Sequence, residues 1–229
     1  MKNFIIGCCI GLFFMACSSD KEGIMHVRGE IKGLKKGTIY LNKQIDTAFV
    51  AIDSISLNGN GIFSLSDKIE SPEIYYLSLG NGVGKKIMFF GDVGEISIHT
   101  KLEKFVLNAD IKGQKNQQLL DEYSEMMKKF RDKDLDLIKA DFESKGDTLK
   151  RDSILKVSQS LLKRRYFYTT NFAVKNADAE IAPYLAITEL YNANINLLDT
   201  INKSLTPEVK RSKYGKELNE FISKIKSEN

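Results

Sequence analysis

The segment Ile52–Ser66, IDSISLNGNGIFSLS, places an Asn-Gly-Asn-Gly turn between two stretches in which apolar and polar residues alternate. A period of two is typical of strands that bury one face. Asn and Gly both tolerate positive φ, which a tight turn between antiparallel strands requires. The segment therefore predicts a β-hairpin, and the residues on either side continue the same pattern.

Alternating stretches between turn-forming residues predict eight short strands in residues 24–113. This region holds 11 of the 16 glycines, whereas residues 114–229 hold two, and glycine marks turns. Strands at this spacing favour an antiparallel β-sandwich or open barrel. The expected strands are Ile24–Lys32, Thr38–Lys43, Ala48–Leu57, Ile62–Ser66, Ile74–Leu79, Lys86–Phe90, Glu95–Thr100 and Phe105–Ile111.

Residues 114–229 have apolar residues at helical spacing, and 39 of these 116 residues are charged, as solvated helix faces require. A break at Gly146-Asp147 separates two long apolar stripes, which predicts an antiparallel helical hairpin with Asp147 or Thr148 as the second N-cap. The stripes are Leu119, Tyr123, Met126, Phe130 and Leu137, and then Ile154, Val157, Leu161, Tyr168 and Phe172.

Shorter helices are expected to follow the hairpin. Ala182-Pro183 predicts the start of a third helix that runs to about Ala193. Thr206-Pro207-Glu208 predicts a fourth, because Thr suits the N-cap and Pro the first turn. Tyr214–Lys226 is expected to be the last helix. The expected fold class is α+β, with a β-sandwich or open-barrel domain at 24–113 and a helical domain at 114–229.

The N-terminus has the features of an export signal. Lys2 is followed by an uncharged run from Phe4 to Ala16, which is too short for a membrane-spanning helix of about 20 residues. The sequence FMAC at 14–17 resembles a lipobox. This predicts a lipoprotein signal peptide at 1–16, cleavage between Ala16 and Cys17, and lipidation of Cys17. An ordinary signal peptide cleaved nearby is the alternative.

Loss of residues 1–16 would remove Cys8 and Cys9 and leave lipidated Cys17 as the remaining cysteine. The mature chain would then hold no disulfide, redox Cys pair or thiolate metal site. Residues 17–23 are expected to tether the β-domain to the outer membrane. Whether the periplasmic or the surface face carries it stays open.

The charged and motif residues favour no catalytic chemistry. A formal net charge of +4, from 34 basic and 30 acidic residues, is too balanced to indicate a nucleic-acid partner. His26 and His99 lie in expected strands without the spacing of a zinc site. The glycine-rich stretch 80–86 departs from the spacing of a phosphate-binding loop. We therefore expect no catalytic residue, no metal and no cofactor.

Three segments carry a family resemblance: VRGEIKGLKKGTIYL at 27–41, IDSISLNGNGIFSLSDKIESPEIYYLSL at 52–79 and IMFFGDVGEISIH at 87–99. They resemble the N-terminal domain of certain Bacteroidota lipoproteins, known as domain of unknown function 4369. That domain usually precedes a thioredoxin-like domain of the thiol–disulfide oxidoreductase type. The helical stretch LTPEVKRSKYGKELNEFISKIK at 205–226 resembles the part between the two domains.

Residues 1–229 hold no Cys-x-x-Cys pair, so we expect the thioredoxin-like domain to be absent. The resemblance therefore implies the architecture and an envelope location rather than the oxidoreductase activity. No catalytic residue transfers, because none of the matching positions is catalytic.

Five Asp-Ser or Asp-Thr pairs are each followed by an apolar residue, where average composition gives about one match. The pattern resembles the Bacteroidota O-glycosylation motif. The alternative is that these pairs serve as turns and helix caps. The candidate glycosylated residues are Thr47, Ser54, Thr148, Ser153 and Thr200.

These observations predict a lipid-anchored outer-membrane protein that acts as a non-catalytic binding or accessory module. Exposed edge strands and long helices are the expected docking surfaces. The resemblance suggests a thioredoxin-like envelope protein as the partner, acting in trans. Two alternatives stay open: an envelope enzyme with an unrecognised mechanism, and a truncated relic of a thioredoxin-like lipoprotein.

Overall fold

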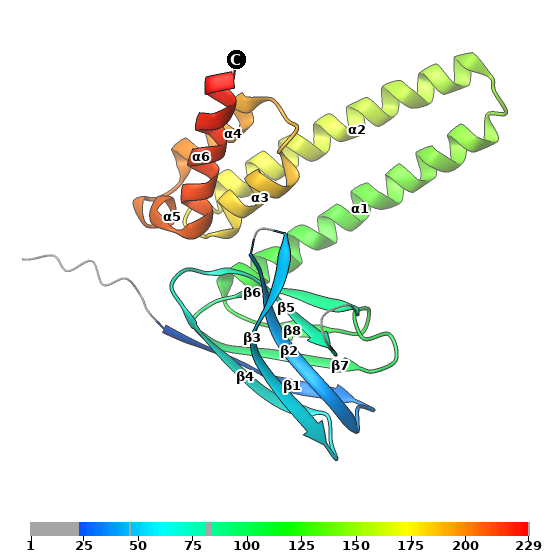
Figure 1. The fold of residues 1–229 in the computed structure, drawn as a ribbon. Coiled ribbons are helices and arrows are strands. Elements are labelled where there is room, and N and C mark those ends of the chain that lie inside the picture. The colour runs from blue at the N-terminus through cyan, green and yellow to red at the C-terminus, as the bar shows by residue number, and fades with distance from the viewer. Residues whose placement is uncertain (1–22, 46, 81–83, 229) are drawn as a thin grey trace, which may run out of the picture.

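The computed structural model describes residues 23–45, 47–80 and 84–228. A β-rich region is followed by a helical region, which confirms the expected α+β class (Figure 1). Cys17, Ala16 and the tether up to residue 22 lie outside the described residues. Among the helices of the described ranges, none combines the length and the apolar character needed to span a bilayer.

The β-rich region forms two four-stranded sheets, with the orders β4, β1, β7, β8 and β3, β2, β5, β6. The strands are β1 (Gly23–Lys32), β2 (Lys36–Ile45), β3 (Ala48–Asn58), β4 (Ile62–Ile69), β5 (Glu73–Leu79), β6 (Lys86–Gly91), β7 (Gly94–Lys101) and β8 (Asp110–Lys112). The inner faces of both sheets bury one apolar core, to which Val27, Ile98, Leu41 and Tyr75 contribute with no exposed surface. Each such side chain contributes about 1.5–3 kcal/mol by its burial.

The segment Ile52–Ser66 forms two strands and a turn, but the expected hairpin pairing is wrong. β3 pairs with β2 and β4 pairs with β1, so the turn carries the chain from one sheet to the other. The Gly59 N–H donates to the carbonyl of Lys35 at 2.7 Å, and the Gly61 carbonyl accepts from Ile31 at 2.8 Å. Alternation indicates which face of a strand is buried, and it does not identify the neighbouring strand.

The expectation of a wholly antiparallel sandwich is also wrong at one place. β1 and β7 pair in parallel, whereas the other pairings are antiparallel. The two strands approach closely at Gly29, where a β-carbon would collide with the carbonyl oxygen of Ile98. A parallel neighbour requires a long crossover, here through the other sheet, and local alternation carries no trace of it.

The last expected strand, Phe105–Ile111, is mostly a turn, and β8 spans only Asp110–Lys112. Residues 103–108 form turns instead. Phe105 is buried in the core, and its carbonyl accepts a hydrogen bond of 2.6 Å from the Thr100 hydroxyl. The buried Phe105 side chain fits the alternating pattern of a strand, which is why the sequence predicted a strand here although the backbone forms a turn.

The helices are α1 (Lys115–Glu143), α2 (Thr148–Lys175), α3 (Ile181–Glu189), α4 (Ile195–Ser204), α5 (Pro207–Arg211) and α6 (Lys213–Glu228). The helical hairpin of α1 and α2 is confirmed (Figure 1). Asp147 caps α2 as expected, because its carboxylate accepts from the backbone N–H groups of Leu149 and Lys150. Thr206 likewise caps α5, with its side chain accepting from Val209.

The third expected helix is wrong at its end, because α3 stops at Glu189 and α4 follows as a separate helix. The cause is an N-cap: the Asn194 side chain accepts from the Asn196 N–H at 2.9 Å. Apolar Leu198 and Ile201 then bury the inner face of α4. Both the Asn194 cap and the apolar spacing are local signals from which α4 was predictable, although the expected helices above did not include it.

An apolar joint connects the β-rich region to the helices. Phe90 has no exposed surface and meets the rings of Tyr184 and Tyr214 edge-on, at centroid distances of 5.8 and 6.1 Å. Its N–H donates to Gln117 of α1 at 2.7 Å. The N–H of Ile74 donates to the Tyr214 hydroxyl at 3.0 Å. Strands β5 and β6 are therefore fixed to α1, α3 and α6.

Asn116 forms the polar centre of this joint. Its Nδ2 donates to Glu180 at 2.8 Å and to Asp92 at 3.3 Å, while its Oδ1 accepts from the Ile181 N–H at 3.0 Å. One buried amide thus links the β6–β7 turn with the first residues of α1 and α3.

An ion-pair network continues the joint toward α6. Lys43 lies 2.8 Å from Asp67 and 3.0 Å from Glu73, and Glu73 also pairs with Lys213. The Tyr75 hydroxyl donates to Asp67 at 2.7 Å. Burial lowers the pKa of Lys43, but its bonds to the two carboxylates outweigh burial and raise it overall. Lys43 and Glu73 each have two partners of opposite charge, so the network compensates charge on both sides of the joint.

We predict that Phe90→Ala lowers the free energy of unfolding by about 3–5 kcal/mol, because a filled aromatic site becomes a cavity. The matched control is Phe142→Ala, since Phe142 is 87% exposed and should change stability by less than about 0.5 kcal/mol. Urea unfolding followed by circular dichroism measures both. Equal effects of the two variants would contradict the joint.

Burial raises the pKa of Glu180 above its ordinary value of 4.5, although the Asn116 hydrogen bond opposes the shift. A carboxyl with a raised pKa in the folded state favours folding while protonated, and that contribution is lost as pH rises through the raised value. We therefore predict that Glu180→Gln gains stability relative to wild type as pH rises from about 4.5 to neutral. A difference that does not vary with pH in matched unfolding curves would contradict this.

Candidate functional site

The α1–α2 hairpin extends well beyond the rest of the molecule (Figure 1). The buried residues of α1 all precede Lys128, and those of α2 all lie at or after Leu161. The distal turns of both helices thus have no layer packed over them among the described residues. We call the part formed by residues 131–158 the hairpin tip.

Aromatic side chains hold the two helices together at the body end of the hairpin. The rings of Tyr123 and Phe172 lie 5.4 Å apart, and Tyr168 stacks near Tyr123 and Phe130. The Tyr123 hydroxyl lies 2.7 Å from the Thr169 hydroxyl. The two expected stripes therefore meet here, and they do not form a comparable seam at the tip, where Val157 is 46% exposed.

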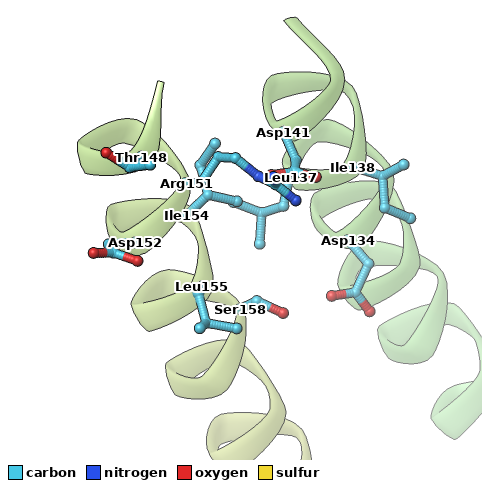
Figure 2. A pocket seen from close by; sticks show the side chains of 10 residues that line it. All are labelled: Asp134, Leu137, Ile138, Asp141, Thr148, Arg151, Asp152, Ile154, Leu155 and Ser158. Atoms are coloured by element: carbon cyan, nitrogen blue, oxygen red, sulfur yellow. The ribbon is translucent and has the colours of Figure 1, made fainter. Parts of the chain in front are cut away.

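A groove of about 680 Å³ lies between α1 and α2 at the tip (Figure 2). Its walls combine aliphatic side chains with three aspartates and one arginine. The lining residues are Asp134, Leu137, Ile138, Asp141, Thr148, Arg151, Asp152, Ile154, Leu155 and Ser158.

Large aliphatic side chains are unusually exposed around this groove. Ile138 is 65% exposed and Leu155 is 57% exposed, and each comes from a different wall. Leu135 and Phe142 add further exposed apolar surface on α1. Apolar surface gathered on neighbouring turns marks an interaction site more often than chance exposure does.

The charge of the groove is negative. Arg151 bonds to Asp141 across the groove, with 3.1 Å between Nε and Oδ1. Both groups are about half exposed, so this pair adds little stability. Asp134 and Asp152 have no ion-pair partner within the described ranges. Two carboxylates are therefore available to a bound cationic group.

A smaller hollow of about 250 Å³ shares Asp134 and Ser158 with the groove and continues it toward the body. Arg165 lines this hollow. Its Nε is buried and has no hydrogen-bond acceptor in the described part of the chain. The hollow therefore adds Arg165, with an Nε–H donor that has no acceptor in the described residues, at the body end of the groove.

Two residues of the expected stripes, Leu137 and Ile154, line the groove, although the sequence prediction did not include a groove. Ile138 follows Leu135 by three residues and precedes Phe142 by four, which indicates a second apolar face on α1. Of these three residues, Ile138 lines the groove.

All five candidate glycosylation residues are exposed. Thr148 and Ser153 lie in the first turns of α2, and Thr148 lines the groove. Ser54 lies in β3, Thr47 lies between β2 and β3, and Thr200 lies in α4. Asp147 caps α2, as expected if the Asp147-Thr148 pair serves as a helix cap. The exposure of all five residues is also compatible with O-glycosylation. Glycosylation therefore stays a prediction.

His26 and His99 lie exposed on β1 and β7. In the part of the chain that the structure describes, no group of three His, Cys, Asp or Glu residues is arranged to hold a metal ion. The expected glycine-rich loop lies partly outside the described residues, at 81–83.

We predict that Leu155→Glu leaves the free energy of unfolding within about 0.5 kcal/mol of wild type, because the side chain already faces water. Leu161→Glu is the matched contrast. Leu161 is 3% exposed, and a buried unpaired charge should cost several kcal/mol. Thermal unfolding followed at a helix signal measures both, and a large loss in Leu155→Glu would show that the tip is closed.

The comparisons with known proteins concern the sandwich. Residues 25–120 match the family model described as Domain of unknown function (DUF4369). The match covers nearly all of the two sheets and the first turn of α1. No curated protein matches the chain. The β-rich part of this chain is therefore similar to the DUF4369 domain.

Proposed function

We propose that this chain is a lipid-anchored docking module of a bacterial outer membrane. Cys17 carries the lipid, the sandwich lies close to the membrane, and the hairpin tip receives a protein partner. The observation that carries the proposal is the groove at the tip, where Ile138 and Leu155 face solvent from opposite walls.

The arrangement of the ends supports this reading. The residues between Cys17 and the start of β1 span at most about 25 Å when fully extended. The start of β1 and the hairpin tip lie on opposite sides of the molecule (Figure 1). The anchor would thus hold one end at the bilayer while the tip stays accessible.

We propose binding rather than catalysis at the groove. Acid–base catalysis depends on groups whose ionisation is tuned by burial or close charges. The groove instead offers exposed aliphatic side chains, Ile138 and Leu155, which suit binding of an apolar surface. The family resemblance suggests a thioredoxin-like envelope protein as the partner, acting in trans.

A cross-linked pull-down from native cell envelopes tests the proposal, using a C-terminal tag. We predict that Leu155→Glu lowers partner recovery by about tenfold, because a charge would enter the apolar contact. Leu107→Glu is the matched control, because Leu107 is 84% exposed on the sandwich rather than the tip. Cys17→Ser should release the protein from the membrane fraction.

Identical partner sets from wild type and Leu155→Glu would contradict docking at the groove. Retention of Cys17→Ser in the membrane fraction would contradict the lipid anchor and leave the docking result unaffected.

A further inference from the structure

We infer that the occupant of the groove is an amphipathic helix of a partner protein, with an apolar face flanked by Lys or Arg residues, lying in line with α3. The inference rests on the proposed function and names the chemistry of the partner. It combines three observations: the shape of the space between α1 and α2, the faces that border it, and its charge.

At the body end, α3 already packs against both helices of the hairpin, beside the aromatic seam that joins them. Ile181 and Leu185 of α3 are buried with Leu120 of α1 and Phe172 of α2 in one cluster. Figure 1 shows α3 beside this end of the hairpin, with the tip extending past it. The molecule itself thus shows that a helix can pack along this side of the hairpin.

The groove lies on the faces that α3 covers. Ile138 follows Leu120 by 18 residues, and Leu155 precedes Ala173 by 18 residues. Eighteen residues make about five turns, which returns a side chain to the same face. Leu120 and Ala173 are both buried in clusters that include α3 residues. The faces beneath α3 therefore continue to the tip, where Ile138 and Leu155 are exposed and nothing in the described chain covers them.

The length of the groove matches that of a short helix. Its lining residues run from 134 to 141 on α1 and from 148 to 158 on α2. At a rise of 1.5 Å per residue, these stretches correspond to roughly 10–15 Å, or two to three helical turns. An occupant would present apolar side chains at i, i+3 and i+7 to Ile138 and Leu155.

Charge selects among the helices that fit. Asp134, Asp141 and Asp152 line the groove with Arg151 as the one cation among its lining residues, and Asp141 already engages that arginine. Basic residues on the flanks of the occupant would therefore pair with Asp134 and Asp152. At the inner end, the Arg165 Nε offers a donor to an acceptor of the bound helix.

The same charges disfavour a second copy of this chain docked groove to groove. A two-fold interface places identical surfaces together. Asp134 and Asp152 of one copy would then lie against the same carboxylates of the other, with one arginine per groove to offset them. A basic partner helix removes this repulsion.

Two synthetic peptides test the inference against purified full-length protein. Both are about 14 residues long, with Leu at i, i+3, i+7 and i+10 on an Ala background, and their flanking positions carry Lys in one and Glu in the other. Fluorescence anisotropy of labelled peptide measures binding. We expect the Lys peptide to bind at least about tenfold more tightly, with the difference shrinking at high ionic strength.

Variants assign the binding to the groove. Leu155→Gln should weaken the Lys peptide about tenfold, and Asp134→Asn with Asp152→Asn should remove most of the preference over the Glu peptide. Leu107→Gln on the sandwich should change neither. Binding that is equal for both peptides, or unaffected by Leu155→Gln, would overturn the inference.

Other outcomes separate this inference from the proposed function. Stronger binding of the Glu peptide that still depends on Leu155 would overturn the basic partner and keep the docking site. Absence of peptide binding, together with a dimer that Leu155→Gln dissociates in sedimentation, would replace the helix by a second copy. Absence of peptide binding alongside an unchanged pull-down would overturn both.

Discussion

The buried contact between Phe90 and the tyrosines of α3 and α6 fixes the relation between the two halves of this molecule. It lies on the outer face of β6, so the sandwich supplies a packed wall rather than a flexible attachment. Asn116 orients α3 at this joint. Its Oδ1 accepts from the N–H of Ile181 at the start of α3, and its Nδ2 donates to Glu180 and Asp92. A hairpin that starts at this joint therefore projects from the sandwich at a fixed angle.

The joint also explains why the body end of the hairpin is packed for stability whereas the tip exposes apolar side chains. Near the body, aromatic packing around Tyr123 holds α1 and α2 together and α3 fills the space beside them. Toward the tip the same helices lack these neighbours, and their aliphatic side chains face water. The body end thus provides the free energy that holds the tip in place, while the tip keeps apolar surface free for a partner. A glycan on Thr148 would occupy the mouth of the groove and compete with that partner.

The sequence predicted properties that depend on neighbours along the chain. The α+β class, the helical hairpin and the caps at Asp147 and Thr206 all follow from local periodicity and hydrogen-bonding chemistry. Pairings between distant segments were not predictable in this way. The parallel β1–β7 ladder and the crossing of Ile52–Ser66 between sheets depend on which strand lies next in space. The groove was predictable only in part, since Leu137 and Ile154 belong to the expected stripes but periodicity does not show that their helices separate at the tip.

Site-specific photo-cross-linking in intact cells tests the central claim most directly. A photoreactive phenylalanine analogue replaces Leu155 at the tip or, in the control, Leu107 on the sandwich, both of which are solvent-exposed. The account predicts a discrete adduct of higher mass from position 155 and none of that mass from position 107. Adducts of the same masses from both positions, or none from position 155, would contradict the claim that the hairpin tip is a docking surface.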